Sequence, residues 1–226
     1  MNISKNIVII PARGGSKRLP RKNLLNLNEF PLLVHSINYA KANAGIIDKI
    51  VVSTDDSEIK ELAIQNGVEV IDRPSHLATD TSPTVTALKH VLENINEDFE
   101  NVILLQPTNP LRPVNLLREA FQKYNAGGYD SLVSVSRNHQ KLGKIIENKF
   151  VPFNYEIGQR SQDIAPLYYE NGLLYITKSE LILREQILGK NHFAYIVDHP
   201  FGEIDIDTQE DFLIAEMYAK LYTDDL

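Results

Sequence analysis

Short apolar runs rich in β-branched residues alternate with helix-periodic stretches through the first 135 residues. Four helices are predicted from the spacing of apolar residues, over 31–44, 56–66, 83–95 and 114–124. The apolar runs between and around them occupy 6–10, 49–54, 68–71, 101–106 and 131–135. Strands that are apolar on both faces and alternate with helices are typical of a parallel sheet covered by helices on both sides. The pattern predicts an α/β fold, a Rossmann-like three-layer sandwich with a mostly parallel sheet.

After residue 135 the alternation stops. Residues 137–170 carry scattered polar side chains without a clear period, over a longer stretch than ordinary connections between elements. We interpret this segment as an inserted functional arm or subunit contact within one domain that spans 1–226. Regular structure is predicted again over 172–176, 193–197 and 209–221, where Thr208 precedes the last helix as its N-cap.

Composition excludes several classes of protein. The 226 residues include no cysteine, which excludes disulfides, thiolate metal sites and cysteine nucleophiles. The net charge of −7 argues against nucleic acid or a membrane surface as a partner. No apolar run approaches the roughly 18 residues that span a bilayer, and the N-terminus does not resemble a signal peptide. We expect a cytoplasmic protein.

A basic loop follows the first predicted strand, over residues 11–23. Open α/β sheets place their ligands at this edge, beyond the carboxyl ends of the strands. Gly14 and Gly15 allow close approach of the backbone to an anion, and a di- or triphosphate suits the local charge. The loop lacks both the Walker A and the dinucleotide-binding patterns, and a merely solvated basic loop is the alternative. Its five cations are Arg13, Lys17, Arg18, Arg21 and Lys22.

A pair of aspartates, Asp205 and Asp207, precedes the last predicted helix. In an extended segment, residues two apart point in the same direction, so both carboxylates face one place. Like charges held together are costly unless a cation joins them, and hard oxygen ligands favour Mg²⁺. The alternative is that Asp207 or Thr208 caps the helix while Asp205 is a surface charge.

Several ordered motifs together resemble those of the CMP-sialic acid synthetases, also called acylneuraminate cytidylyltransferases. The resemblance covers nearly the whole chain, from the basic loop to the aspartate pair. It implies transfer of CMP from CTP to the anomeric hydroxyl of a 2-keto-3-deoxy nonulosonic acid, with release of pyrophosphate and a requirement for Mg²⁺. The motifs lie at 10–23, 52–55, 73–74, 77–82, 105–112, 170–172 and 204–208.

The resemblance also implies roles for individual residues. It assigns the catalytic roles to Arg13, Lys22 and Asp207, with Lys22 stabilising charge on the α-phosphate and the leaving pyrophosphate. Asp205 and Asp207 would be the metal ligands. Taken without the resemblance, Arg73 is only a charge at a strand end and Ser82 only a helix cap. The implied nucleotide-binding residues are Arg13, Ser16, Lys17, Asn23, Arg73, Ser82 and Thr84.

The resemblance also implies that four residues bind the acceptor sugar: Gln106, Arg160, Glu170 and Asn171. An amide at Gln106 can donate to and accept from sugar hydroxyls, and Arg160 is a suitable bidentate partner for a sugar carboxylate. The alternatives are a turn glutamine and a surface arginine. In the family the arm packs across a homodimer, so we expect a homodimer. Some relatives have Arg-Pro where this chain has Tyr169-Glu170, which leaves the identity of the acceptor open.

Three other functions remain compatible with the sequence. A cytidylyltransferase for a 3-deoxy-octulosonate-type acid differs mainly in its acceptor. A metal-dependent glycosyltransferase also combines an α/β sheet with an Asp-x-Asp pair, but it releases a nucleoside diphosphate. A non-catalytic nucleotide-binding module would bind CTP without forming pyrophosphate. Neither the particular nonulosonic acid nor the general base is identified by the sequence.

Overall fold

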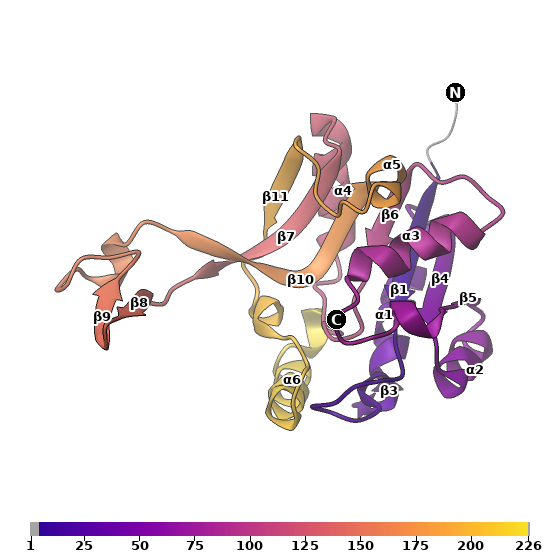
Figure 1. Ribbon diagram of the computed structural model, residues 1–226, viewed down its shortest axis with the longest axis horizontal. Coiled ribbons are helices and arrows are strands. Elements are labelled where there is room, and N and C mark those ends of the chain that lie inside the picture. Colours follow the sequence, from indigo (N-terminus) through magenta and orange to yellow (C-terminus); the bar gives the residue numbers. More distant parts are fainter. Residues whose placement is uncertain (1–4, 226) are drawn as a thin grey trace.

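The computed structural model describes residues 5–225, so residues 1–4 and 226 of the predicted domain lie outside the described part. Within that part, seven strands form one sheet in the order β11-β7-β10-β6-β1-β4-β5 (Figure 1). All neighbouring pairs are parallel except those of β10, which runs antiparallel to both β6 and β7. The strands span β1 Asn6–Pro11, β4 Lys49–Thr54, β5 Glu69–Asp72, β6 Asn101–Leu104, β7 Ser131–Asn138, β10 Leu167–Lys178 and β11 His192–Ile196.

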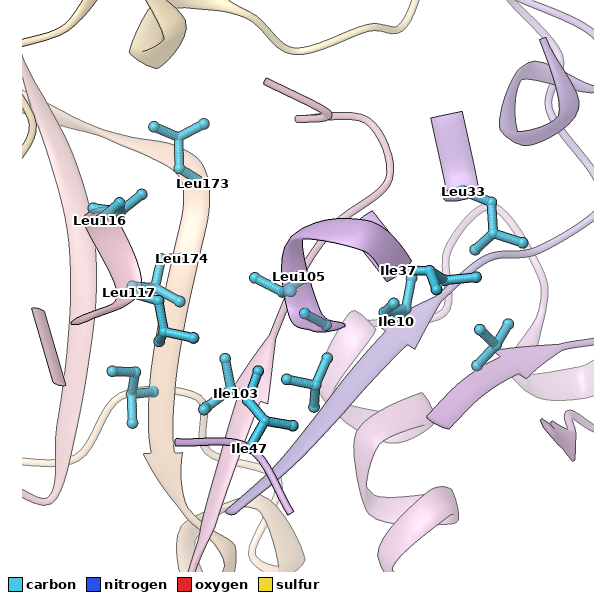
Figure 2. Packing of buried hydrophobic residues seen from close by; sticks show 14 of the residues in the cluster. Ile10, Leu33, Ile37, Ile47, Ile103, Leu105, Leu116, Leu117, Leu173 and Leu174 are labelled. Carbon is cyan, nitrogen blue, oxygen red and sulfur yellow. The ribbon is translucent and has the colours of Figure 1, made fainter. Parts of the chain in front are cut away.

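Helices cover both faces of this sheet. On one face, α1 packs against β1 and β4, α2 against β4 and β5, and α4 against β7 and β10. Figure 2 shows Ile10 of β1 beside Ile37 of α1, and Leu117 of α4 beside Leu174 of β10. On the other face, α3 and α5 pack against Ile7 and other alternate residues of the strands. The predicted three-layer α/β sandwich is therefore confirmed. The helices span α1 Leu32–Ala42, α2 Ser57–Gln65, α3 Thr84–Asn94, α4 Leu116–Gly127 and α5 Ser179–Leu183.

The last helix lies outside these two layers. Helix α6 (Gln209–Leu221) begins at Thr208, whose side chain accepts from the N–H of Asp211 while the Asp211 carboxylate accepts from the N–H of Thr208, so the predicted N-cap is confirmed. A separate apolar cluster packs α6 and the preceding segment against the basic loop through Ile206, Leu19 and Leu27. This packing brings the aspartate segment beside the loop that follows β1.

The structure adds elements that the sequence pattern did not predict. Strand β10 is longer than the predicted 172–176, and its pairing with β7 shifts register between Glu170 and Tyr175. Two small hairpins, β2–β3 and β8–β9, also form, as does the short helix α5. The hairpin strands are β2 Asn26–Leu27, β3 Phe30–Pro31, β8 Gly143–Ile146 and β9 Lys149–Pro152.

Residues 139–166 form an arm that projects from the sheet. Figure 1 shows β8 and β9 far from the other strands, at the end of a long excursion between β7 and β10. Much of the arm's apolar surface is exposed, with Ile157 at 79% and Phe153 at 62% of their full accessible areas. The arm lies where the sequence predicts an insertion. Its polar residues follow no clear period because both faces of the β8–β9 hairpin are exposed to water.

Along residues 5–225, every helix is too short or too polar to cross a bilayer.

Candidate active site

A cavity of about 260 Å³ opens at the carboxyl edge of the sheet. Its walls come from the segments that follow β1, β5 and β6, which is the edge predicted to hold the ligand. Predicted nucleotide-binding and acceptor-binding residues meet here within one chain. The cavity is lined by Pro11, Arg13, Lys22, Asn23, Arg73, Leu77, Thr79, Asp80, Ser82, Pro83, Thr84, Gln106, Pro107 and Thr108.

The basic loop is held to the sheet by its backbone. The N–H of Gly14 donates to Asp55 Oδ1 at 3.0 Å, and the Asn23 side chain donates to the carbonyl of Arg13 at 3.0 Å. A Cβ on Gly14 would lie 2.6 Å from Asp56 Oδ2, so only glycine fits this close approach. The loop is thus fixed at both ends before any ligand binds.

Asp80 forms ion pairs with two cations of this loop. Its carboxylate lies 2.9 Å from Arg13 Nη1 and 2.7 Å from Lys17 Nζ. The hydrogen bond from Lys17, assisted by Arg13, holds the pKa of Asp80 below its ordinary value. The same two cations are predicted to bind phosphate, so the Asp80 carboxylate occupies the position where we expect a phosphate to bind.

Arg73 lies deeper in the cavity wall, with 8% of its surface exposed. It donates to the carbonyl of Ser53 at 2.6 Å and to the Ser53 hydroxyl at 3.1 Å. Burial, with a further contribution from the positive charge of Arg13, lowers the pKa of Arg73 to about 10, although Asp55 opposes the shift. Arg73 remains cationic at neutral pH and is held rigidly by the end of β4.

Lys22 joins the cavity to the aspartate pair. Its ammonium lies in the cavity wall and donates to Asp207 Oδ1 at 2.7 Å and to the carbonyl of Ile206 at 3.0 Å. Arg18 also pairs with the Asp207 carboxylate. Arg21 precedes Lys22 in the left-handed conformation, at φ 57°, where the chain turns into a short 3₁₀ segment. The first and last predicted motifs therefore converge.

The two aspartates differ in environment. Asp205 is exposed overall, but partial desolvation of its carboxylate raises its pKa. Asp207 adds to the rise, while the Thr108 hydroxyl and Lys22 oppose it. Asp207 forms ion pairs with Arg18 and Lys22. Two neighbouring carboxylates such as Asp205 and Asp207 repel each other, and a cation bound between them relieves that repulsion.

The Asp205 and Asp207 carboxylates suit a Mg²⁺ ion that also binds the nucleotide phosphates better than they suit a metal site formed by protein ligands alone. Among residues 5–225, no cluster of three or more His, Cys, Asp or Glu side chains has the arrangement of a metal site. Asp205 and Asp207 nevertheless supply hard oxygen donors, and Asp207 contacts Lys22 of the cavity wall. Mg²⁺ commonly binds one or two carboxylates together with substrate phosphates.

The four predicted acceptor-binding residues have different positions. Gln106 lines the cavity. Glu170 is exposed at the register shift of β10, where its Oε2 accepts from the Tyr175 hydroxyl at 2.9 Å. The Asn171 side chain is buried, in contrast to its predicted contact with substrate. Arg160 is exposed in the arm and pairs with Asp163 at 2.8 Å, so the structure does not bring it to the cavity of its own chain.

The burial of Asn171 has a clear physical cause. Its Oδ1 accepts from the Ser134 hydroxyl at 2.6 Å and from the N–H of Leu173 at 3.1 Å, and its Nδ2 donates to the Ser136 hydroxyl at 3.0 Å. These bonds occupy the amide inside the sheet. In this structure Asn171 supports the bulge of β10 between Glu170 and Tyr175.

Residues around the cavity that the sequence analysis did not single out include Asp80, Thr108, Asn109 and Arg112. Arg112 is almost fully buried and donates to the carbonyls of Gln106 and Leu173, both at 2.8 Å. Burial lowers its pKa to about 10. All four lie inside motifs already noted, at 77–82 and 105–112. Their closeness in sequence to predicted site residues such as Ser82 and Gln106 was the one signal that could have identified them.

The sheet, its cation-lined edge and the adjoining carboxylates define an α/β nucleotidyltransferase fold. A family model described as cytidylyltransferase matches residues 7–226, and the chain belongs to this cytidylyltransferase family.

Curated relatives agree with this family. The chain is 36% identical over 217 residues to N-acylneuraminate cytidylyltransferase of Streptococcus agalactiae serotype V, a match that covers 92% of this chain and 52% of the relative. The chain thus spans about half the length of that relative. It is 32% identical to pseudaminic acid cytidylyltransferase of Campylobacter jejuni, covering 96% of this chain and 97% of the relative. CMP-N,N'-diacetyllegionaminic acid synthase of Legionella pneumophila is 33% identical, with 95% and 96% covered.

Solved structures share the fold. CMP:2-keto-3-deoxy-manno-octonic acid synthetase, solved in complex with CTP, superposes with a TM-score of 0.70 at 17% identity, covering 99% of this chain and 100% of that one. A 4-diphosphocytidyl-2C-methyl-D-erythritol synthase also gives a TM-score of 0.70, at 12% identity, covering 96% and 99%.

Proposed function

We propose that this protein transfers CMP from CTP to the anomeric hydroxyl of a sialic-acid-like nonulosonic acid. The hydroxyl oxygen forms a bond to the α-phosphorus, the bond from that phosphorus to the bridging β-oxygen breaks, and pyrophosphate leaves. The hydroxyl proton passes to a base. The observation that carries the proposal is the position of Lys22, which lies in the cavity wall and contacts Asp207.

The fixed cations supply most of the proposed catalysis. Phosphoryl-type transfer depends chiefly on positioning and on stabilising negative charge, and pre-organised cations do both. Arg13 and Lys17 bind the phosphates in place of Asp80, and Lys22 faces the charge that develops on the α-phosphate and the leaving group. The basic loop also contributes Ser16 and Asn23 toward the phosphates and ribose.

The deeper wall binds the nucleoside. Arg73, Ser82 and Thr84 line the cavity at the end of β5 and the start of α3. Ser82 is held in its loop by a hydrogen bond to the carbonyl of His76, at 3.1 Å. The preference for cytosine rests on the family and on the CTP complex of the structural neighbour.

Mg²⁺ is the proposed metal, held by Asp205 and Asp207 together with the triphosphate. When bound, it would neutralise phosphate charge and increase the electrophilicity of the α-phosphorus. To hold the metal, Asp207 would give up part of its pairing with Lys22 and Arg18.

The acceptor is proposed as a class, the nonulosonic acids. The relatives named above act, by their names, on neuraminic, pseudaminic and legionaminic acids. Gln106 on the cavity wall and Glu170, oriented by Tyr175, are the acceptor-facing polar groups that this chain itself supplies.

A homodimer explains the arm. Arg160 pairs with Asp163 in its own chain and does not line the cavity. The arm also exposes several large apolar side chains, an uncommon concentration for a free surface. Burying that surface against a second copy would remove it from water and would bring Arg160 toward a neighbouring cavity. These side chains are Ile145, Ile146, Phe150, Val151, Phe153 and Ile157.

Product analysis tests the proposal. The protein is incubated with CTP, Mg²⁺ and a panel of nonulosonic and octulosonic acids, and products are measured by mass spectrometry. The expected product has the mass of one acid plus CMP less water. Conversion confined to octulosonate-type acids would favour the other cytidylyltransferase. Sugar transfer from a nucleotide sugar would favour a glycosyltransferase, and CTP binding without any product a non-catalytic module.

A further inference from the structure

Asn109 is among the most buried polar residues of the protein, with 1% of its surface exposed, and it lies in the loop that follows β6. Its Nδ2 donates to the carbonyl of Ile204 at 2.7 Å and to the carbonyl of Asn171 at 3.1 Å. Ile204 immediately precedes Asp205, and Asn171 immediately follows Glu170. One amide therefore ties the aspartate segment to the acceptor-facing bulge of β10.

The neighbouring Thr108 reinforces the first of these connections. Its carbonyl accepts from the N–H of Ile206 at 2.8 Å, and its hydroxyl donates to Asn109 Oδ1 at 3.2 Å. Asp205 is consequently held through the residues on both sides of it.

The second connection depends on Gly172. This residue has φ +74°, and a Cβ built on it would lie 2.6 Å from Asn109 Oδ1. A side chain at this position would displace the amide of Asn109 as well as strain the backbone. Asn109 and Gly172 therefore fit together as a unit, with the amide filling the space that the missing side chain leaves.

We propose that Asn109 is a positioning residue that sets the distance between the Asp205/Asp207 pair and the acceptor-binding bulge. The inference rests on the proposed function, because these two segments are the ones that must hold the metal-bound triphosphate and the incoming sugar hydroxyl in line. A shift of about 1 Å between reacting groups can lower turnover by as much as 100-fold. Binding of CTP without metal depends on other walls of the cavity and is little affected.

Asn109→Ser tests this role, because a serine side chain is too short to reach both carbonyls. The matched control is Asn43→Ser. Asn43 is also buried, at 8% exposure, and donates to the carbonyl of Tyr39 at 2.9 Å at the end of α1, far from the cavity. Both variants lose a buried amide, so both are expected to melt at a lower temperature than the parent protein.

Three measurements distinguish a positioning role of Asn109 from a general loss of stability in the variant. Hydrogen exchange is expected to accelerate in Asn109→Ser at both 204–207 and 170–174, and at neither in Asn43→Ser. Mn²⁺ is expected to bind more weakly to the CTP complex of Asn109→Ser alone. In steady state at saturating Mg²⁺ and CTP, kcat of that variant falls by about 30-fold to 100-fold.

The outcomes distinguish this inference from the proposed function. If the parent protein forms CMP-sugar but Asn109→Ser matches the control in exchange, Mn²⁺ binding and kcat, the inference is wrong and the function stands. If the parent makes no product but exchange and Mn²⁺ binding change as expected, the coupling stands and the proposed function fails. If Asn109→Ser does not fold, Gly172→Ala displaces the same amide and decides by the same readouts.

Discussion

The ammonium of Lys22 lies 2.7 Å from the Asp207 carboxylate, although 185 residues separate them in the chain. Lys22 follows the first strand, whereas Asp207 precedes the last helix, and the apolar cluster that includes Leu19, Ile206 and Phe212 brings them together. A cation from the phosphate-binding loop and a carboxylate suited to a metal thus share one edge of the sheet.

Lys22→Met is expected to lower kcat by about 100-fold to 1000-fold, because it removes a fixed cation from the developing phosphate charge. The KM for CTP should change by a few-fold at most, since Arg13, Lys17 and Arg73 remain. Steady-state kinetics measure both constants. Lys60→Met is the control. Lys60 of α2 also pairs with an aspartate, Asp72 of the edge strand β5, but neither residue lines the cavity. A Lys22 variant with unchanged kcat would contradict the catalytic role.

Asp80→Asn is expected to lower the Kd for CTP by about threefold, because the carboxylate competes with phosphate for Arg13 and Lys17. Binding of CTP is measured by calorimetry at low and physiological salt, and the gain should shrink as salt increases. Asp72→Asn, which removes an exposed carboxylate paired with Lys60, is the matched control. Weaker binding in Asp80→Asn would show instead that Asp80 helps to form the site.

The fold was predictable because buried parallel strands leave continuous apolar runs in the sequence. The direction of β10 was not, since the period of a strand does not record whether its neighbours run parallel. Strand β2, Asn26–Leu27, is too short to show a period, and β8–β9 exposes both faces, so neither hairpin leaves an alternating pattern.

The site was predictable in part for the same reason. Arg13, Arg73 and Gln106 follow three different strands, and parallel strands end at one edge. The roles of Asp80 and Asn109 depend on tertiary neighbours that no local spacing reveals. Asn171 was placed near the acceptor, but its burial depends on the hydroxyls of Ser134 and Ser136 in the adjacent strand.

The burial of His35 is expected to make the folded protein less stable in mild acid. Burial, with a smaller contribution from Arg112, lowers its pKa from 6.5, while hydrogen bonds to the carbonyls of Leu27 and Phe30 oppose the shift. Below pH 6.5 the unfolded chain therefore takes up a proton that the folded chain does not, so the free energy of unfolding decreases as pH falls. A single proton contributes at most about 1.4 kcal/mol per pH unit.

Denaturant unfolding between pH 7.5 and 5 measures this effect. In His35→Gln the stability should depend less on pH, because glutamine can still donate to the carbonyl of Leu27 without titrating. His192→Gln, at an exposed position, is the control and should keep the parent's pH dependence. Equal slopes for the parent and His35→Gln would refute the assignment.

If the protein is the proposed dimer, the double substitution Phe153→Ser and Ile157→Ser is expected to shift it toward monomer, because it removes exposed apolar surface from the arm. Sedimentation equilibrium measures the mass. Turnover should fall together with dimerisation if Arg160 of the neighbouring copy reaches the cavity. Leu183→Ser is the control, because Leu183 is 45% exposed on α5, outside the arm. A monomeric parent protein would rule out the proposed dimer.

Release of pyrophosphate, measured with each of the four nucleoside triphosphates in the presence and absence of a nonulosonic acid and Mg²⁺, tests the central proposal most directly. We predict rapid release only when CTP, the acid and Mg²⁺ are all present, with one pyrophosphate formed for each CMP-sugar. Absence of pyrophosphate with every nucleotide and every acid in the panel would contradict it.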